Sequence, residues 1–329
     1  MPEVAGLTAY ASFFLITALV NAIVCLGLNL QWGQTGLFNV GVAGFVAIGA
    51  YASALLTTPA GAGHWGGFAL PIVIGWLGAM AAGGALAAFV GALTLRLRAD
   101  YLAITTFGVA VAVHLVALNA QRLTGGAFGI GFIPRPFEGL AERPALFGLA
   151  NLAVVGALVG VLYVALERLV RSPWGRVLRA LREDERAARS LGKNPTRYRL
   201  QAFALGGAIM GLGGAVHAHF IGFIAPDNYQ SSLTFQIWAM LIVGGSGNNR
   251  GAIFGAVLIW ALWSASGLAI GVLLPPEEQA RAAALRIVAI GVMLAATIVL
   301  RPRGLFGERA IVSRHLDDAA RTARPAPGE

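Results

Sequence analysis

A densely charged segment between residues 171 and 199 offers the clearest chemistry in this sequence, because long apolar runs flank it on both sides. Ten of the 24 lysine and arginine residues fall between Arg168 and Arg199, and the acidic run Glu183-Asp184-Glu185 lies at their centre. Charges of both signs on a solvated surface favour contact with a partner outside the bilayer. A basic cytoplasmic loop that only sets topology gives the same composition. Spacing alone leaves the two interpretations equally open.

Helix-capping and helix-ending residues in this segment predict one short helix, from about Pro173 to Leu191. Ser172 can cap its first turn, and proline suits the first helical position. Gly192 can end it in a left-handed conformation, and Asn194-Pro195 follows. Pairs of opposite charge four positions apart can form along its surface, namely Arg179 with Glu183 and Glu185 with Arg189. A modest apolar stripe has helical spacing: Val177, Leu178, Leu181, Ala188 and Leu191.

Two catalytic motifs are present only in part. A phosphate-binding loop needs a lysine after glycine, followed by serine or threonine, whereas the single lysine, Lys193, precedes Asn194. Ser246 stands in a Gly-Gly-Ser-Gly run like that of rhomboid-type intramembrane proteases, but only His315, in the tail, follows it as a base. We therefore expect no catalytic residue and no ATPase site in this chain. An intramembrane serine hydrolase remains the remote alternative.

A metal site is not expected either. His217 and His219 are two positions apart, which places them on different faces of a helix, whereas metal ligands on one helix favour a spacing of three or four. The spacing favours packing or pore-lining roles, and we expect His114 to be satisfied by a neighbouring helix.

The composition places the chain in a membrane. Of its 329 residues, 57% are hydrophobic and 12% are charged, and the mean hydropathy is +0.73. Apolar runs of about 20 residues recur and are continuous, which predicts an all-α polytopic protein with about eight or nine transmembrane helices. The predicted spans are about 9–30, 38–56, 68–95, 101–119, 148–166, 203–224, 233–243, 252–274 and 284–300. The second segment either crosses fully or is partly broken, and irregular backbone at that depth must be shielded by protein.

The arginine distribution predicts the topology. The net charge of +9 gathers in a few loops and the tail, as the positive-inside rule predicts, which argues against nucleic-acid binding. Arg96, Arg98, the charged segment, Arg250 and the tail are expected in the cytoplasm, while Thr124 and Glu138 are expected outside. Residues 1–307 form the predicted transmembrane domain, and 308–329 form a cytoplasmic tail that is disordered at its end.

Glycines mark three places where the backbone needs special geometry. In the outer loop at 121–147, Thr124-Gly125-Gly126 predicts a tight turn, and Pro134 follows. In span 203–224, the four-residue spacing of Gly207 and Gly211 predicts close helix contact. A second loop contains Gly244, Gly245, Gly247 and Gly251.

Further motifs recur in a specific order along the chain. They are Gly36-Leu37 through Gly49-Ala50-Tyr51, Thr124-Gly125-Gly126 with Gly129 and Ile133-Pro134, Arg182-Glu183-Asp184-Glu185-Arg186-Ala187-Ala188 with Leu191-Gly192, Pro226, Gly244-Gly245, Gly247, Gly251, Gly255-Ala256, and Arg301-Pro302-Arg303-Gly304-Leu305-Phe306-Gly307. In this order, over nearly all of residues 20–307, the sequence resembles the permease subunits of branched-chain amino acid ABC transporters, specifically the longer of the two paired permeases. It departs from the family at Asn248-Asn249-Arg250 and in the tail after Arg309.

The resemblance implies an all-helical importer fold distantly like that of the vitamin B12 importer permeases. The helix at 173–191 would be the coupling helix that docks into a cytoplasmic ATPase, through Arg182, Glu183, Asp184, Glu185, Arg186, Leu191 and Gly192. The outer loops, with Thr124, Gly125, Gly126 and Pro134, would contact a periplasmic solute-binding protein or form a gate.

The resemblance also implies the partners and the location. They are a second homologous permease, two ATPase subunits that bind ATP and magnesium in place of this chain, the periplasmic binding protein and the lipid of a bacterial inner membrane. Urea or short-chain amides are the alternative solutes, because their permeases share these motifs.

Overall fold

The computed structural model describes residues 2–60, 65–95, 99–273, 275–301 and 304–307. Arg96, Arg98, Pro302, Arg303 and the predicted tail at 308–329 lie outside the described residues.

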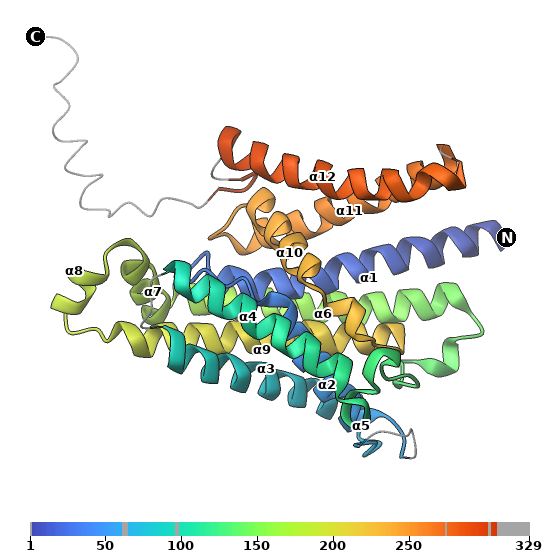
Figure 1. Ribbon diagram of the computed structural model, residues 1–329, viewed down its shortest axis with the longest axis horizontal. Helices are drawn as coiled ribbons and strands as arrows, with labels where there is room; N and C mark the ends of the chain where they lie inside the picture. The colour runs from blue at the N-terminus through green and yellow to red at the C-terminus, as the bar shows by residue number, and fades with distance from the viewer. Residues whose placement is uncertain (1, 61–64, 96–98, 274, 302–303, 308–329) are drawn as a thin grey trace, which may run out of the picture.

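Helices account for nearly all regular structure in these ranges (Figure 1). The longer helices are α1 (Pro2–Gln31), α2 (Val42–Thr57), α3 (Ile72–Thr94), α4 (Ala99–Asn119), α6 (Pro144–Arg171), α9 (Pro195–Ile221), α10 (Ser231–Gly244), α11 (Asn249–Leu273) and α12 (Pro276–Leu300). The short elements are α5 (Gln121–Thr124), α7 (Pro173–Glu183), α8 (Glu185–Ser190) and the 3₁₀ turns η1 (Gly126–Phe128), η2 (Glu138–Leu140) and η3 (Pro226–Tyr229). Across the described ranges, β-type pairing is limited to one bridge between Ile130 and Ile224. The predicted all-α class is confirmed.

Each of the nine predicted apolar segments forms a helix. Within the described ranges, six helices are long and apolar enough to cross a membrane, namely α1, α3, α4, α6, α9 and α11. The other three are α2 with 16 residues, α10 with 14 residues and α12 with 25 residues. The predicted span 38–56 is helical only from Val42, so the chain between α1 and α2 is irregular.

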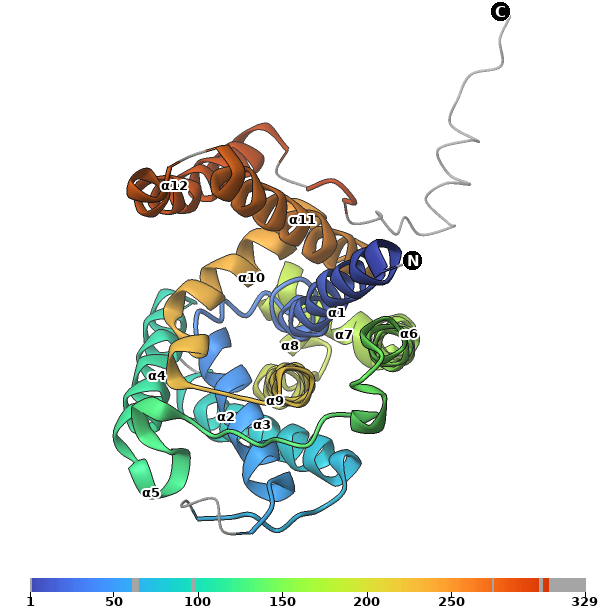
Figure 2. The same ribbon diagram turned by 90° about the vertical axis from the view of Figure 1, so that its right-hand side faces the viewer.

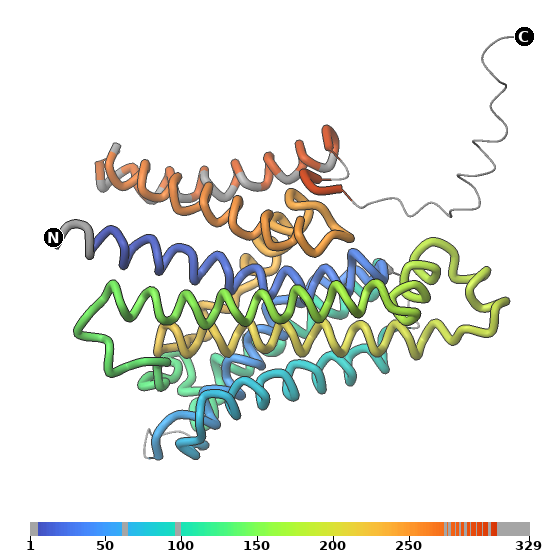
Figure 3. The backbone as a smooth tube through the Cα atoms, turned by 180° about the vertical axis from the view of Figure 1, so that it is seen from behind, coloured from blue at the N-terminus to red at the C-terminus, as the bar shows by residue number. Residues whose placement is uncertain are grey.

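The connections between helices gather at two opposite ends of the molecule (Figures 1 and 3). One end, here called the basic end, carries α7, α8 and the loop at 245–248. The other, here called the loop end, carries residues 120–143 and 222–230. Lys193 and Arg250 therefore lie at one end, and Thr124 and Glu138 at the other. This grouping agrees with the sidedness predicted from the arginines.

Helix α9 lies at the centre of the helix bundle, with α1, α2, α3 and α6 around it (Figure 2). In the most apolar stretch of α9, 72% of the residues are buried inside the protein, and in that of α1, 67%. The corresponding shares for α3, α4, α6 and α11 are 22% or less. Helices α9 and α1 form the core together with α2, in which 12 of 16 residues are buried, whereas α3, α4, α6 and α11 leave broad apolar faces.

Glycines allow α3 to approach α9 closely. A Cβ atom added to Gly211 would lie 2.6 Å from the carbonyl oxygen of Ala79 and 3.3 Å from the Cα of Gly83. A Cβ atom on Gly207 would overlap the side chain of Ala87. These contacts leave no space for a larger residue, and the close helix contact predicted at Gly207 and Gly211 is confirmed.

Replacing Gly211 with alanine is expected to destabilise the protein by about 1–3 kcal/mol, because the added methyl group must push α3 and α9 apart. The matched control is Gly156→Ala in α6, where no atom lies within 4 Å of the new methyl group. Thermal unfolding of the two purified variants in detergent measures the difference. Equal melting temperatures for both variants would show that the α3–α9 contact tolerates expansion.

Candidate functional site

The charged segment folds into two helices, and the prediction of one helix from Pro173 to Leu191 is wrong. The first helix begins as predicted: the Ser172 hydroxyl accepts a hydrogen bond from a backbone N–H in the first turn, and Pro173 takes the first position. The helix stops because Asp184 is extended, with φ −147° and ψ 101°. Its carboxylate accepts hydrogen bonds from the backbone N–H groups of Arg186, at 2.8 Å, and Ala187, at 3.0 Å. Asp184 therefore caps α8 as a separate helix.

Three apolar residues fix α7 and α8 to the membrane helices. Leu178, Leu181 and Ala188 are 0%, 1% and 4% exposed. Leu191, predicted on the same stripe, is instead 79% exposed and leaves an apolar side chain available for contact. Gly192 has the predicted left-handed conformation, with φ +75°, and no atom lies within 4 Å of its Cβ position.

The acidic residues differ in their roles. Glu185 forms the predicted ion pair with Arg189 at 2.6 Å, and a second with Arg199 at 2.7 Å, in the first turn of α9. Glu185 therefore ties α8 to α9. Glu183 is exposed, and Arg179, expected to pair with it, instead donates a hydrogen bond to the carbonyl of Val170 at 3.3 Å.

Arg182 connects α7 to the irregular segment between α1 and α2, here called the joint (residues 31–41). The Arg182 guanidinium donates a hydrogen bond to the carbonyl of Gly33. Its Cγ lies 3.1 Å from the position that a Cβ of Gly36 would take, and Gly36 has φ +73°. Glycine is therefore needed both for the turn and for the side chain packed against it.

Buried polar side chains hold the joint together. Gln31 is 0% exposed: its Nε2 donates to the carbonyl of Phe203 in α9 at 2.7 Å, and its Oε1 accepts from Asn39 Nδ2 at 2.7 Å. Asn39 Oδ1 accepts in turn from the backbone N–H of Gly41 at 2.7 Å. The Asn39 amide thus replaces one backbone hydrogen bond that a continuous helix would have supplied, and Gln31 holds that amide in place.

Neighbouring helices complete the hydrogen bonding of the joint. The Thr106 hydroxyl in α4 accepts from the N–H of Val40 at 3.0 Å, and the Trp238 indole in α10 donates to the carbonyl of Asn39 at 2.9 Å. The Thr234 hydroxyl accepts from the N–H of Ala43 at 3.0 Å. Of the two alternatives left open by the sequence for residues 38–56, the structure shows the partly broken one at residues 38–41, and this irregular backbone is shielded by protein.

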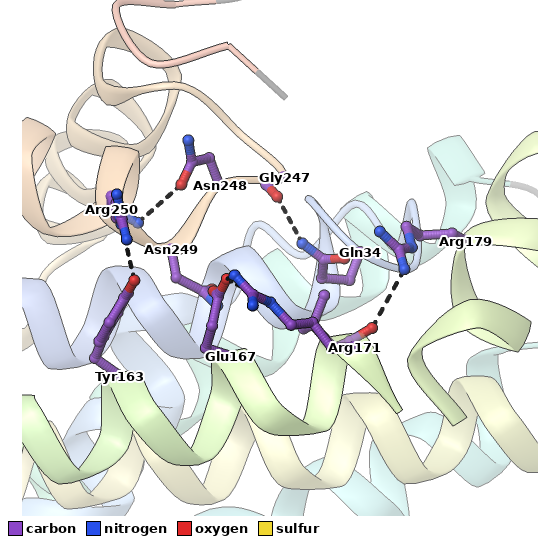
Figure 4. A network of polar contacts seen from close by, with 10 residues as sticks. Gln34, Tyr163, Glu167, Arg171, Arg179, Gly247, Asn248, Asn249 and Arg250 are labelled. Atoms are coloured by element: carbon purple, nitrogen blue, oxygen red, sulfur yellow. Dashed lines mark hydrogen bonds and ion pairs between the residues drawn. The ribbon is translucent and has the colours of Figure 1, made fainter. Parts of the chain in front are cut away.

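The glycine-rich loop at 244–251 is fastened to the joint. Gln34 Nε2 donates to the carbonyl of Gly247 at 2.7 Å (Figure 4), and the N–H of Gly247 donates to Asn29 Oδ1 at 2.8 Å. Gly244 packs directly on the backbone of Gly251, so that α10 and α11 meet without an intervening side chain. Gly245 and Gly247 supply positive φ angles of +113° and +85°.

A polar network extends from this loop along α6 (Figure 4). Glu167 forms an ion pair with Arg171 at 2.6 Å and accepts a hydrogen bond from Asn249 Nδ2 at 3.2 Å. Arg250 Nε donates to the Tyr163 hydroxyl at 2.9 Å. Within the Asn248-Asn249-Arg250 departure from the resembled family, Asn249 and Arg250 thus contact α6. Asn248 instead donates to the carbonyl of Phe306 at 3.3 Å and accepts from the N–H of Arg250 at 3.0 Å.

At the loop end lie three residues that were predicted to be in the outer loop: Thr124, Gly125 and Gly126. They stabilise the turn there and do not form its exposed surface. Thr124 is 5% exposed, and its hydroxyl donates to the carbonyl oxygens of Ala117 and Ala120, at 2.6 and 2.9 Å. The two glycines have positive φ angles of +74° and +61°. Side chains just beyond them, Phe128 and Phe132, are 85% and 87% exposed.

Pro134 is held by a buried histidine. His219, 0% exposed, places Nδ1 at 2.8 Å from the carbonyl of Pro134 and Nε2 at 2.8 Å from the Ser53 hydroxyl in α2. A carbonyl can only accept, so Nδ1 carries the proton and, in the neutral ring, Nε2 accepts from the hydroxyl. His219 thus has a packing role, and His114 binds the carbonyl of Pro226 at 3.2 Å. Among the described residues, no group of three or more His, Cys, Asp or Glu side chains could hold a metal.

Several residues of these networks were not identified from the sequence. Lone polar residues inside apolar runs were the available signal, and they are Asn29, Gln31, Asn39, Ser53, Thr106 and Thr234. Their partners lie far away in the chain, so no local spacing connects them.

Comparison with known proteins gives a consistent result. The family described as branched-chain amino acid transport system / permease component matches residues 10–297. The high-affinity branched-chain amino acid transport system permease protein LivM of Escherichia coli (strain K12) is 38% identical over 262 residues, which cover 73% of this chain and 60% of the relative. Its counterpart in Salmonella typhimurium (strain LT2) is 36% identical with the same coverage.

An archaeal relative aligns over a larger share. The probable branched-chain amino acid transport permease protein LivM of Methanocaldococcus jannaschii is 28% identical over 332 residues, which cover 88% of this chain and 91% of the relative. The alignments with the two bacterial relatives span 60% of their length. No solved structure gives a significant match.

Replacing Gln31 with leucine is expected to destabilise the protein by about 1–3 kcal/mol, because Asn39 and the Phe203 carbonyl lose their buried partner. Gln121→Leu, at an exposed position of the loop end, is the matched control and should stay within about 0.5 kcal/mol of the parent. Denaturation in mixed micelles measures both. A Gln31→Leu protein as stable as the control would show that the joint does not depend on this amide.

Proposed function

The chain belongs to the family of permease components of branched-chain amino acid transport systems, and on this premise we propose that it forms the membrane pathway of an ATP-driven importer of branched-chain amino acids. The family match over residues 10–297 carries the proposal. Its proposed partners are a second homologous permease, two cytoplasmic ATPase subunits that bind ATP and magnesium, and a periplasmic binding protein that delivers the solute. The proposed location is the cytoplasmic membrane of a bacterium.

The basic end is the proposed docking surface for the ATPase. Helices α7 and α8 project beyond the neighbouring helix ends (Figures 1 and 3). Leu191 offers an exposed apolar side chain, and Glu183 and Arg186 are exposed charges of the same segment. A rigid, capped surface of mixed polarity is what transmission of force from a moving partner requires.

Force applied to α7 has a direct route into the membrane domain. Arg182 in α7 binds Gly33 of the joint, and Gln34 of the joint binds Gly247 in the glycine-rich loop. Glu185 gives α8 a second attachment, to Arg199 at the start of α9. We propose that closure of the ATPase subunits moves the joint and α9 together, and that this movement opens and closes the solute pathway.

Glu185→Lys and Gly192→Val are expected to insert and fold but to abolish coupled uptake. The first removes both ion pairs of α8, and the second places a β-branched residue at φ +75°, where it is strained. The measurements are L-leucine uptake and ATPase stimulation by loaded binding protein, in proteoliposomes holding all membrane-associated subunits. Gly192→Asn, which tolerates this conformation, is the matched control and should retain more than about half of the activity. Normal uptake and stimulation in both test variants would refute the coupling role.

The proposed orientation makes a separate prediction. Cysteine introduced at Lys193 should react with an impermeant thiol reagent only after cells are opened, and cysteine at Glu138 should react in intact cells. Both positions are exposed, whereas the native Cys25 is 0% exposed and should give little background. Labelling of position 193 in intact cells would reverse the assigned orientation.

A further inference from the structure

A cavity of about 640 Å³ opens at the loop end, within the size range of about 300–1,000 Å³ that is typical of small-molecule sites. Three parts of the chain form it: the end of α2 and the start of α3, the loop at 132–138, and the end of α9. Its lining includes Leu70, Ile72, Phe132, Pro134, Arg135 and Glu138. We call this cavity the outer pocket.

The backbone around the outer pocket is unusually strained. In the part of the chain that the structure describes, three non-glycine residues have positive φ angles: Ala69 at 50°, Phe132 at 55° and Phe137 at 57°. Two of them line the pocket, and the third precedes Glu138 in the chain. Such strain persists where the surroundings hold the backbone in place, and it is concentrated at ligand-binding sites.

The wall that carries the charges is firmly anchored. His219 Nδ1 donates a hydrogen bond to the carbonyl of Pro134 at 2.8 Å. The Arg135 guanidinium lies across Gly222, where an added Cβ would be 2.5 Å from its Nε, and its Nη2 donates to the carbonyl of Ile221 at 2.5 Å. The end of α9 therefore positions the arginine, and its other N–H groups have no partner among the described residues.

The outer pocket is lined by two side chains of opposite charge, Arg135 and Glu138. Among the described residues, neither Arg135 nor Glu138 has an ion-pair partner, and the Glu138 carboxylate accepts no hydrogen bond there. Leu70, Ile72 and Phe132 supply apolar surface in the same cavity. A cation, an anion and an apolar wall match the three parts of a zwitterionic amino acid with an aliphatic side chain.

We propose that the outer pocket binds free branched-chain amino acids directly. Arg135 binds the α-carboxylate, Glu138 binds the α-ammonium group, and Leu70, Ile72 and Phe132 contact the aliphatic side chain. This inference rests on the proposed function for the choice of solute and assigns a recognition site to the permease itself.

The test measures binding of tritiated L-leucine to the full-length chain, purified with its associated membrane subunits in nanodiscs and without a binding protein. Leucinamide, which lacks the carboxylate, and 4-methylpentanoate, which lacks the ammonium group, should each compete at least about tenfold more weakly than leucine. This comparison uses the unsubstituted protein, so it does not depend on the folding of any variant. Equal competition by all three compounds, or no leucine binding at millimolar concentration, overturns the proposal.

Variants then assign each charge. Arg135→Gln should weaken leucine binding about tenfold and make leucinamide as good a competitor as leucine. Glu138→Gln should do the same for 4-methylpentanoate, and its fold is not at risk because the Glu138 side chain makes no hydrogen bond or ion pair within the described structure, while its backbone carbonyl, which accepts from Ala141, is unchanged. Arg143→Gln and Glu142→Gln, exposed positions of the same loop outside the pocket lining, are the matched controls and should bind leucine normally.

Uptake in proteoliposomes separates this inference from the proposed function. Normal leucine uptake with unaltered binding in Arg135→Gln and Glu138→Gln overturns the pocket and leaves the importer intact. Reduced uptake with unaltered direct binding also overturns it and assigns the charges to contact with the binding protein. Leucine binding that follows the predicted pattern, without any ATP-driven leucine uptake, supports the pocket and contradicts the importer.

Discussion

A polypeptide that leaves the helical path among membrane helices must find its hydrogen bonds within the protein, and this constraint governs the segment between α1 and α2. Asn39, Thr106 and Trp238 supply bonds to its backbone. Thr234 supplies one to the start of α2, and Gln31 holds Asn39 in place. Each unsatisfied group would cost several kcal/mol in hydrocarbon. The joint is therefore a defined structure, held by α4, α9 and α10, rather than a slack connection.

The same constraint allows the joint to connect α7 with the glycine-rich loop. The backbone of the joint does not form regular helix hydrogen bonds, so the carbonyl of Gly33 can accept a hydrogen bond from outside the bundle. The guanidinium of Arg182 donates that hydrogen bond. Gln34 and Asn29 reach the glycine-rich loop from the same region. The glycines at the α3–α9 contact allow backbones to meet directly, so displacement of one helix is passed to the next without a soft layer of side chains.

The sequence was sufficient for the features that depend on local chemistry. Apolar runs located all nine longer helices, and Ser172, Pro173 and Gly192 have the predicted capping roles. The break at Asp184 was missed because its capping competes with helix continuation, and both fit the same residues. The exposure of Leu191, the link from Arg182 to Gly33 and the outer pocket depend on contacts between distant segments. No periodicity in a single sequence encodes those contacts.

The central claim is that α7 and the joint act as one unit during transport, and a cross-link between them tests it most directly. An ideal Cβ at Gly36 lies 3.8 Å from the Cβ of Arg182, a separation typical of disulfides. In a protein with Cys25 replaced by alanine, Gly36→Cys and Arg182→Cys together remove the native contact and allow a covalent one, and Gly36→Cys alone controls for backbone strain. The account predicts that ATP-driven leucine uptake is low in the reduced double variant and recovers on oxidation. Normal uptake when reduced, or blocked uptake only when oxidised, would contradict it.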